Sequence, residues 1–416
     1  MILTKSTRMW QTLGGLRQLG TGRMSLLVML TGGHTAIHWF QQLFPVILPE
    51  IKTDFRLTDL QVGSLATARE AVSGALALPS GVLADTCRRQ MALILAASLA
   101  CSGLAYWFVG VASAYRWVIA AMALVGVATA LWHPAANASL SMRLPERRGT
   151  ALAVHGVGAS IGDTVGPLTV GALLLLLSWR PLLQLHLIPA LILTVILWRG
   201  LGAVYSQEGP RPSFHAYCKD VKLLLGQPNV IAYIISSGLM GMGRLSALTF
   251  LPIYLREQLG YSAFLLGFHV MLLYVMGMVS QPLMGLLSDR FGRRAVLVPG
   301  MACLGLLYFA LALAGSGLQL GLVIAAMGLF FYGLGNITMA GVMDVAGAGV
   351  QGTSWGLMSV LSHLLSIPSP MIAGFLVSEF GVKSAFLYAS AISVLAAVVL
   401  LRIGAHRPSV PPVSKV

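Results

Sequence analysis

Ionisable side chains occur inside apolar stretches of this 416-residue chain, where a charged group is costly and usually has a function. Arg69 and Glu70 lie side by side in one such stretch, and Arg244 lies alone in another. An arginine fork can hold a carboxylate or phosphate group through two parallel hydrogen bonds. We therefore predict that Arg69 and Arg244 bind an anionic group of a small molecule. The alternatives are an Arg69–Glu70 pair that links neighbouring helices and a bond from Arg244 to backbone carbonyls.

Two carboxylates in apolar stretches are candidates for carrying protons. Glu70 adjoins Arg69, and Asp163 follows Gly162 in a stretch with few other charges. A carboxyl group removed from water holds its proton more firmly and can exchange it near neutral pH. We predict that Glu70 and Asp163 are proton-coupling residues. An ion pair between Asp163 and one of the buried arginines is the alternative.

Most of the nine histidines lie in apolar stretches, and one pair has helical spacing. His34 and His38 are four residues apart, which places both on one face of a helix. Since histidine changes charge near physiological pH, the pair could relay protons or contact a substrate. A transition-metal pair is a further alternative, but the sequence has no HExxH motif and no carboxylate near these histidines. We therefore predict no metal site.

Uncharged and aromatic residues complete the predicted binding set. Trp132 and His133 are adjacent, and a tryptophan ring can stack on a bound molecule. Asn336 offers a hydrogen-bonding amide in another apolar stretch. The full predicted substrate-binding set is Arg69, Arg244, His34, His38, Trp132, His133 and Asn336.

The elements that position these residues must be membrane helices. Residues are 57% hydrophobic and only 10% charged, which leaves too few polar side chains to cover a soluble particle of this size. A bilayer core needs about 20 apolar residues per helix. The sequence predicts an all-α membrane protein with twelve helices, at 25–48, 60–83, 91–111, 117–140, 150–177, 182–201, 229–251, 263–287, 295–313, 320–343, 352–376 and 384–403.

The +14 net charge is unevenly distributed along the predicted topology. Most Lys and Arg residues fall in loops on one side of the membrane, together with both chain ends. The positive-inside rule places that side in the cytoplasm. This distribution argues against a nucleic-acid partner and predicts that both termini are cytoplasmic. The four cysteines show no disulfide or zinc-ligand spacing.

The chain contains two copies of one unit. A glycine, an acid and adjacent arginines close an apolar stretch near residue 85, and the same pattern returns near residue 289. We predict an N-terminal six-helix bundle at 1–203, a cytoplasmic linker at 204–228 and a C-terminal six-helix bundle at 229–416. The paired loops supply a predicted conformational latch, with the residues Gly81, Asp85, Arg89, Gly285, Asp289, Arg290 and Arg293.

Twelve helices in two halves, with these paired loops and a central linker, resemble the major facilitator superfamily over the whole chain. The family's loop pattern is complete in the second copy. The first copy departs from it at Thr86 and at Arg88, where the family has a second glycine. The resemblance implies that the loops latch the cytoplasmic ends of the two halves.

The fifth helix resembles the glycine-proline pattern of antiporters in this family, through Gly162, Gly166, Pro167 and Gly171. Glycines four residues apart also let helix backbones approach closely, which is a purely structural explanation. Segments that contain Trp132, His133 and His155 resemble the fosmidomycin-resistance-like branch, mainly in the N-terminal half. That resemblance implies a proton-driven exporter of small polar or anionic compounds.

These observations together predict a secondary active transporter of the major facilitator fold that works by alternating access. We expect proton-coupled export of a small organic anion or zwitterionic drug-like compound, by antiport. Proton-coupled uptake of an organic anion and export of a divalent metal through the histidines are the alternatives. A sensor that binds ligand without flux is a further class. We expect no enzymatic activity and no cofactor, a monomer with small-molecule and proton partners, and a bacterial inner-membrane location.

Overall fold

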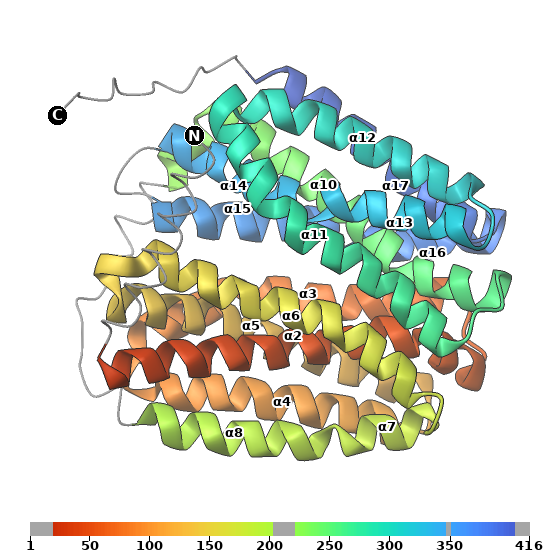
Figure 1. The fold of residues 1–416 in the computed structure, drawn as a ribbon, viewed down its shortest axis with the longest axis horizontal. Coiled ribbons are helices and arrows are strands. Elements are labelled where there is room, and N and C mark those ends of the chain that lie inside the picture. Colours follow the sequence, from red (N-terminus) through yellow and green to blue (C-terminus); the bar gives the residue numbers. More distant parts are fainter. Residues whose placement is uncertain (1–19, 203–220, 347–350, 404–416) are drawn as a thin grey trace. The chain divides into compact units, whose positions relative to one another are not determined.

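The computed structural model describes residues 20–202, 221–346 and 351–403, and every regular element in these ranges is a helix. Figure 1 shows long helices that run beside one another within each half of the chain. In the N-terminal half the helices are α2 (Thr21–Phe55), α3 (Asp59–Thr86), α4 (Met91–Val111), α5 (Tyr115–Arg143), α6 (Arg148–Leu173), α7 (Trp179–Leu185) and α8 (Leu187–Gly202). In the C-terminal half they are α10 (Pro228–Ile253), α11 (Ala263–Phe291), α12 (Arg293–Leu313), α13 (Leu318–Phe331), α14 (Gly333–Ala346), α15 (Gln351–Ser366), α16 (Ser369–Phe380) and α17 (Lys383–Leu401).

All twelve predicted stretches fall on these helices, but three of them are broken. The sixth consists of α7 and α8, the tenth of α13 and α14, and the eleventh of α15 and α16. Pro368 lies at the break before α16, and Pro189 follows the break before α8. Proline has no amide hydrogen and its ring collides with the preceding turn, so a continuous helix is interrupted there. The tenth breaks at Tyr332, beside Gly333.

The helices are long and apolar enough to cross a membrane. Nine spans within the described residues meet both criteria, and they lie on α4, α5, α7 with α8, and the helices of the C-terminal half. The three other long helices are α2, α3 and α6, which carry five of the predicted site residues, His34, His38, Arg69, Glu70 and Asp163. Many large apolar side chains, such as Leu176 and Leu313, remain exposed. A lipid environment is the natural solvent for such a surface.

The chain divides into two compact units. The first comprises residues 1–47 and 68–211, and the second comprises residues 48–67 and 212–416. The last turns of α2 and the first turns of α3 therefore pack within the second unit. Most of the predicted linker at 204–228 lies outside the described residues, so the predicted bundle boundaries stay predictions.

Within each unit the helices pack through small and apolar residues. In the first unit, α4 lies against α5 and α8; in the second, α17 lies against α10 and α12. Tyr106 and Tyr308 are fully buried, one in each unit, at corresponding depths of α4 and α12.

The second copy of the repeated loop forms a charged cluster. The Arg293 guanidinium donates to Asp289 at 2.5 Å and to Asp344 at 2.9 Å. Gly292 between α11 and α12 has φ +94°, a conformation that other residues adopt only with strain. The first copy has Arg88 at this position and continues as a 3₁₀ turn, Arg88–Gln90. The side chain of Asp85 lies outside the described residues.

Candidate functional site

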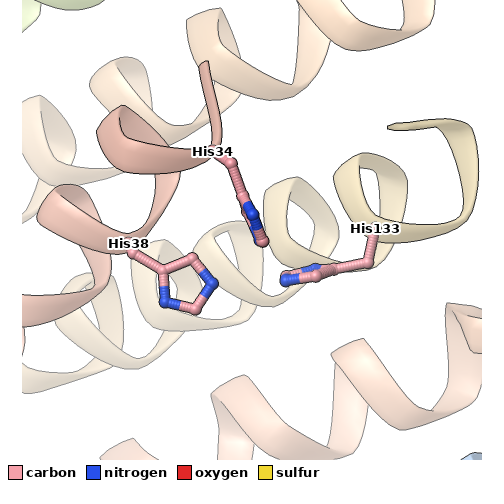
Figure 2. Close-up of side chains that lie close together, drawn as sticks. All are labelled: His34, His38 and His133. Atoms are coloured by element: carbon pink, nitrogen blue, oxygen red, sulfur yellow. The ribbon is translucent and has the colours of Figure 1, made fainter. Parts of the chain in front are cut away.

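The first unit contains a cluster of histidines built by three helices. His34 and His38 lie on α2 and His133 lies on α5, and one ring nitrogen of each lies within 4.8 Å of the others. Figure 2 shows the three rings turned toward a common point. Asp163 from α6 is 3.0 Å from His38, measured from Oδ2 to Nδ1. The structure thus brings four predicted site residues together that are far apart in the chain.

Close packing of α6 on α2 places Asp163 beside His38. A Cβ atom added at Gly162 would collide with the backbone carbonyl of Thr35 and with the Cβ of His38. Gly166 lies equally close to Gln42 on the same face. The glycine pattern recognised in the sequence therefore has a local structural role, because it lets the carboxylate of α6 reach the imidazole of α2.

The hydrogen bonds of the cluster fix the ring orientations. His34 Nδ1 lies 2.8 Å from the carbonyl oxygen of His155, and His133 Nδ1 lies 3.1 Å from that of Thr129. A carbonyl oxygen only accepts, so each Nδ1 carries the proton, as assigned from its partner. The Nε2 atoms of His34 and His133 then carry lone pairs.

The Asp163 carboxylate is held from two sides. Its Oδ1 accepts a hydrogen bond of 2.7 Å from Gln42 Nε2, and its Oδ2 faces His38 Nδ1. The side chains of His38 and Asp163 are only 16% and 13% exposed, so these contacts are largely shielded from solvent. In this arrangement Asp163 orients the His38 ring.

Two aromatic neighbours restrain His34. The His155 ring stacks on it with centroids 3.9 Å apart and planes 8° apart, and the Trp132 ring lies 6.5 Å away and nearly parallel. Trp132 is fully buried against Gly33. In this structure Trp132 lies in the wall beside His34, and its predicted stacking on a substrate stays a prediction.

Arg69 and Glu70 form a second polar centre of the first unit, on α3. Arg69 donates from Nη2 and Nε to Glu70 Oε1 at 2.6 and 2.9 Å. The guanidinium also lies 5.8 Å from the ring centroid of Phe44. Their side chains are 18% and 12% exposed. The alternative to a substrate contact was an Arg69–Glu70 pair that links neighbouring helices, and the observed pair instead joins adjacent residues within α3.

Arg244 is the candidate anion site of the second unit. Its guanidinium lies over the rings of Tyr332, at 5.0 Å, and Phe331, at 5.7 Å. Its Nε is buried without a hydrogen-bond partner, and no carboxylate within the described ranges forms an ion pair with it. In the same unit Asn336 donates to Gln281 Oε1 at 2.9 Å. Asn336 is exposed rather than buried.

The sequence analysis missed two contributors to the histidine cluster. His155 supplies the backbone carbonyl and the stacked ring for His34, and Gln42 fixes Asp163. Gln42 lies four residues after His38, so the helical spacing that paired His34 with His38 could have revealed it. The contact between His155 and His34 depends on tertiary packing and has no signal in the sequence.

Apolar helices long enough to span a membrane, with polar centres buried inside each unit, are typical of a membrane transporter. Residues 30–370 match the family model of the Major Facilitator Superfamily, so the chain belongs to this family. The family identity also confirms the predicted fold class, an all-α membrane protein.

Relatives agree with this assignment. The chain is 28% identical over 348 residues to the multi-drug resistance efflux pump PmrA of Streptococcus pneumoniae, covering 79% of this chain and 82% of that protein. It is 26% identical over 149 residues to the fosmidomycin resistance protein of Escherichia coli, covering 36% of each chain. This second match supports the predicted branch resemblance over part of the chain.

A solved structure shows the same fold. The chain superimposes on a bacterial homologue of the human lysosomal transporter Spinster, crystallised in an inward-facing conformation, with a TM-score of 0.75. The match covers 92% of this chain and 95% of that chain at 17% identity.

Proposed function

We propose that this transporter exports a small organic anion or zwitterionic drug-like compound in exchange for protons. Arg244 carries the proposal: it is a largely buried cation in the middle of α10 that is flanked by aromatic rings. The two halves would alternate access to the site by rocking about it. Binding of proton and substrate would bias the inward and outward states.

The environment of Arg244 suits an anionic group. The rings of Tyr332 and Phe331 cover the guanidinium without neutralising its charge. A planar guanidinium binds a carboxylate or phosphonate through two parallel hydrogen bonds, and a low local dielectric strengthens them. A bound anion would also give Nε the partner it lacks within the described residues.

Glu70 is the proton carrier that the contacts favour. Protonation of Glu70 would cancel its charge and release the Arg69 guanidinium it holds. Protonation of Asp163 would weaken the bonds from Gln42 and His38, which both approach its carboxylate. We therefore place the transported proton on Glu70. Asp163, also predicted as a coupling residue, has a better-supported role in positioning His38.

Export as the direction rests on two supports. PmrA is described as an efflux pump, and α6 carries the glycine-proline pattern that resembles antiporters. The fosmidomycin resistance protein suggests a small anionic probe for this chain. We further propose a monomer in a bacterial inner membrane, with both termini in the cytoplasm.

The Arg69–Glu70 pair favours a second candidate, proton-coupled symport. If Arg69 binds the substrate anion, the Glu70 carboxylate must first leave it, and proton uptake by Glu70 achieves this. Proton and anion would then bind together and move in the same direction. This mechanism differs from export by antiport in the sign of the coupled proton flux.

Arg244→Gln tests the anion site. We expect fosmidomycin, or another organic anion from a panel, to raise the melting temperature of the purified wild-type protein. The variant should lose affinity about 30-fold or more, since removing one partner of a buried charge pair costs about 2–5 kcal/mol. Arg402→Gln, at an exposed arginine of the same unit, should bind as wild type. Stabilisation by cations alone, unchanged in Arg244→Gln, would disprove the anion site.

Proteoliposomes then distinguish the two directions of coupling. Proteoliposomes that contain the protein are loaded with the stabilising anion, and a pH gradient is imposed across their membrane. Proton movement is followed with a pH-sensitive dye. Protons that move against the anion indicate antiport, and protons that move with it indicate symport. Glu70→Gln should abolish the proton flux in either case. An unchanged proton flux in this variant would rule out Glu70 as the carrier.

A further inference from the structure

We propose that His34, His38 and His133 form a binding site for a divalent transition-metal ion such as Zn²⁺, coordinated through their Nε2 atoms. One nitrogen of each ring lies within 4.8 Å of the others (Figure 2). Imidazole is a preferred ligand for Zn²⁺, Ni²⁺ and Co²⁺. This site lies in the first unit and goes beyond the proposed anion transport, which uses other residues.

The contacts of the cluster favour one tautomer on each ring. The Nδ1 atoms of His34, His38 and His133 all face oxygen acceptors, which are two backbone carbonyls and the Asp163 carboxylate. The backbone carbonyls place the proton on Nδ1 of His34 and of His133. The Asp163 carboxylate, 3.0 Å from His38 Nδ1, favours the same tautomer for His38, in which Nε2 carries the lone pair. Three neutral imidazoles in this tautomer form the donor set that a zinc ion needs.

Burial makes such a donor set unfavourable without a cation. His34 is only 6% exposed, and the Nε2 atoms of His34 and His38 have no hydrogen-bond partner within the described residues. Lone pairs that converge in a place shielded from water repel one another and lose their hydration. A cation held between the rings would satisfy them.

The surroundings have the features of an outer ligand shell. Metal-bound histidines usually donate their second N–H group to a carboxylate or a backbone carbonyl, which fixes the ring and makes it more basic. His38 faces Asp163, and Asp163 is itself held by Gln42. The stacked ring of His155 further restrains His34. The negative charge of Asp163 offsets part of the charge of a divalent ion.

The spacing fits a three-histidine site after a small adjustment. Zn–N bonds of about 2.0–2.1 Å in a tetrahedron require nitrogens about 3.4 Å apart. The three nitrogens lie within 4.8 Å of one another, so metal binding would draw them together by up to about 1.4 Å. Three protein ligands leave a position for water or for an oxygen atom of another molecule.

The fold supplies what the sequence analysis found lacking. No metal site was predicted, and metal binding stayed an alternative, because no carboxylate lies near His34 and His38 in the sequence. The helix α5 contributes the third histidine and α6 contributes Asp163, more than 90 residues away along the chain in both cases by their numbering. The same histidines could otherwise relay protons, and metal affinity separates these two explanations.

Metal titration of the full-length protein without an affinity tag tests the proposal. Zn²⁺ binding is measured by calorimetry, and Co²⁺ binding by its visible absorption, which becomes intense in a tetrahedral site. We expect wild type to bind one Zn²⁺ per chain and to give the Co²⁺ band. His34→Asn, His38→Asn and His133→Asn should each weaken binding more than about 100-fold, beyond the effect of a lost outer-shell partner.

Two further variants complete the test. Asp163→Asn should weaken Zn²⁺ binding about 10–100-fold, as expected for an outer-shell carboxylate. His269→Asn is the matched control: His269 is buried in the second unit and its Nδ1 also bonds the carbonyl four residues before it. It should bind Zn²⁺ as wild type. Size-exclusion profiles and metal-free melting temperatures establish which variants are folded.

Three results would overturn the metal site. The first is the absence of saturable Zn²⁺ binding to wild type. The second is unchanged affinity in the folded histidine variants, which would place the ion on cysteines or elsewhere. The third is a loss of Zn²⁺ affinity in His269→Asn that equals the loss in the cluster variants. If one cluster variant does not fold, the other two and Asp163→Asn still decide the question.

Discussion

Arg69 and Glu70 are two charged residues of an apolar helix, where burial of a charge is costly in free energy. Each charge alone in an apolar helix would be expensive, and together they neutralise one another through two hydrogen bonds. The pair is a weak source of net stability, because desolvation offsets most of its attraction. Its value for transport is that a proton or an anion can separate it.

Glu70→Gln should destabilise the folded protein by about 3 kcal/mol, because it leaves the Arg69 charge buried without its carboxylate. The double variant, Arg69→Met with Glu70→Met, should lose less stability than Glu70→Gln, since it removes both charges. Thermal unfolding in detergent measures the difference. A double variant that is less stable than Glu70→Gln would show that the pair contributes net stability.

At the scale of elements, the contact between α2 and α6 determines the geometry of the histidine cluster. The glycines of α6 allow its backbone to approach α2, and Asp163 then reaches His38. Neither helix meets the apolar criteria for a membrane span that nine other described spans meet.

Gly162→Ala should lower stability by about 1–3 kcal/mol, because the added methyl group collides with the backbone of Thr35. The same change at Gly156, on α6 with open space around it, should be neutral or slightly stabilising through helix propensity. Melting temperatures of the two variants make the comparison. Equal destabilisation by both would show that the close approach of the helices is not required.

At the scale of the whole molecule, residues 48–67 of the N-terminal half belong to the second compact unit. Lys52 there contacts Asp59 at 2.6 Å and Glu257 at 2.8 Å, and Arg256 contacts Glu50 at 2.9 Å. Two of these ion pairs, Lys52–Glu257 and Arg256–Glu50, join the last turns of α2 to the turn that follows α10 within the second unit.

Lys52 makes the stability of the second unit depend on pH in the alkaline range. Burial alone would lower the pKa of Lys52, but its hydrogen bonds to Asp59 and Glu257 outweigh burial and raise the pKa above its ordinary value. The stability from Lys52 is therefore complete below the unfolded pKa, near 10.4, and is lost as pH rises through the higher folded pKa.

Lys52→Met measures this contribution. We expect wild type to be more stable than the variant at pH 8, and the difference to shrink as pH rises above about 10.4. Lys222→Met, at an exposed lysine, controls for general alkaline titration. A wild-type advantage that persists unchanged at high pH would mean that the Lys52 charge is not its source.

Most of the fold could be predicted from the sequence. All twelve apolar stretches became helices, because a chain in lipid must satisfy its backbone hydrogen bonds within each helix. The breaks before α8, α14 and α16 were missed, since proline and glycine are often tolerated in membrane helices. The family followed from the repeated loop around Asp289, and the match over residues 30–370 confirmed it.

The candidate site was also predicted only in part from the sequence. Sequence alone determined which residues are chemically capable, because an ionisable group in an apolar stretch is conspicuous wherever it lies. Only the tertiary structure decided which of them act together: it paired Arg69 with Glu70, left Arg244 among aromatic rings, and joined His34 to His133. Contacts between helices depend on packing and helix rotation, and linear spacing encodes neither.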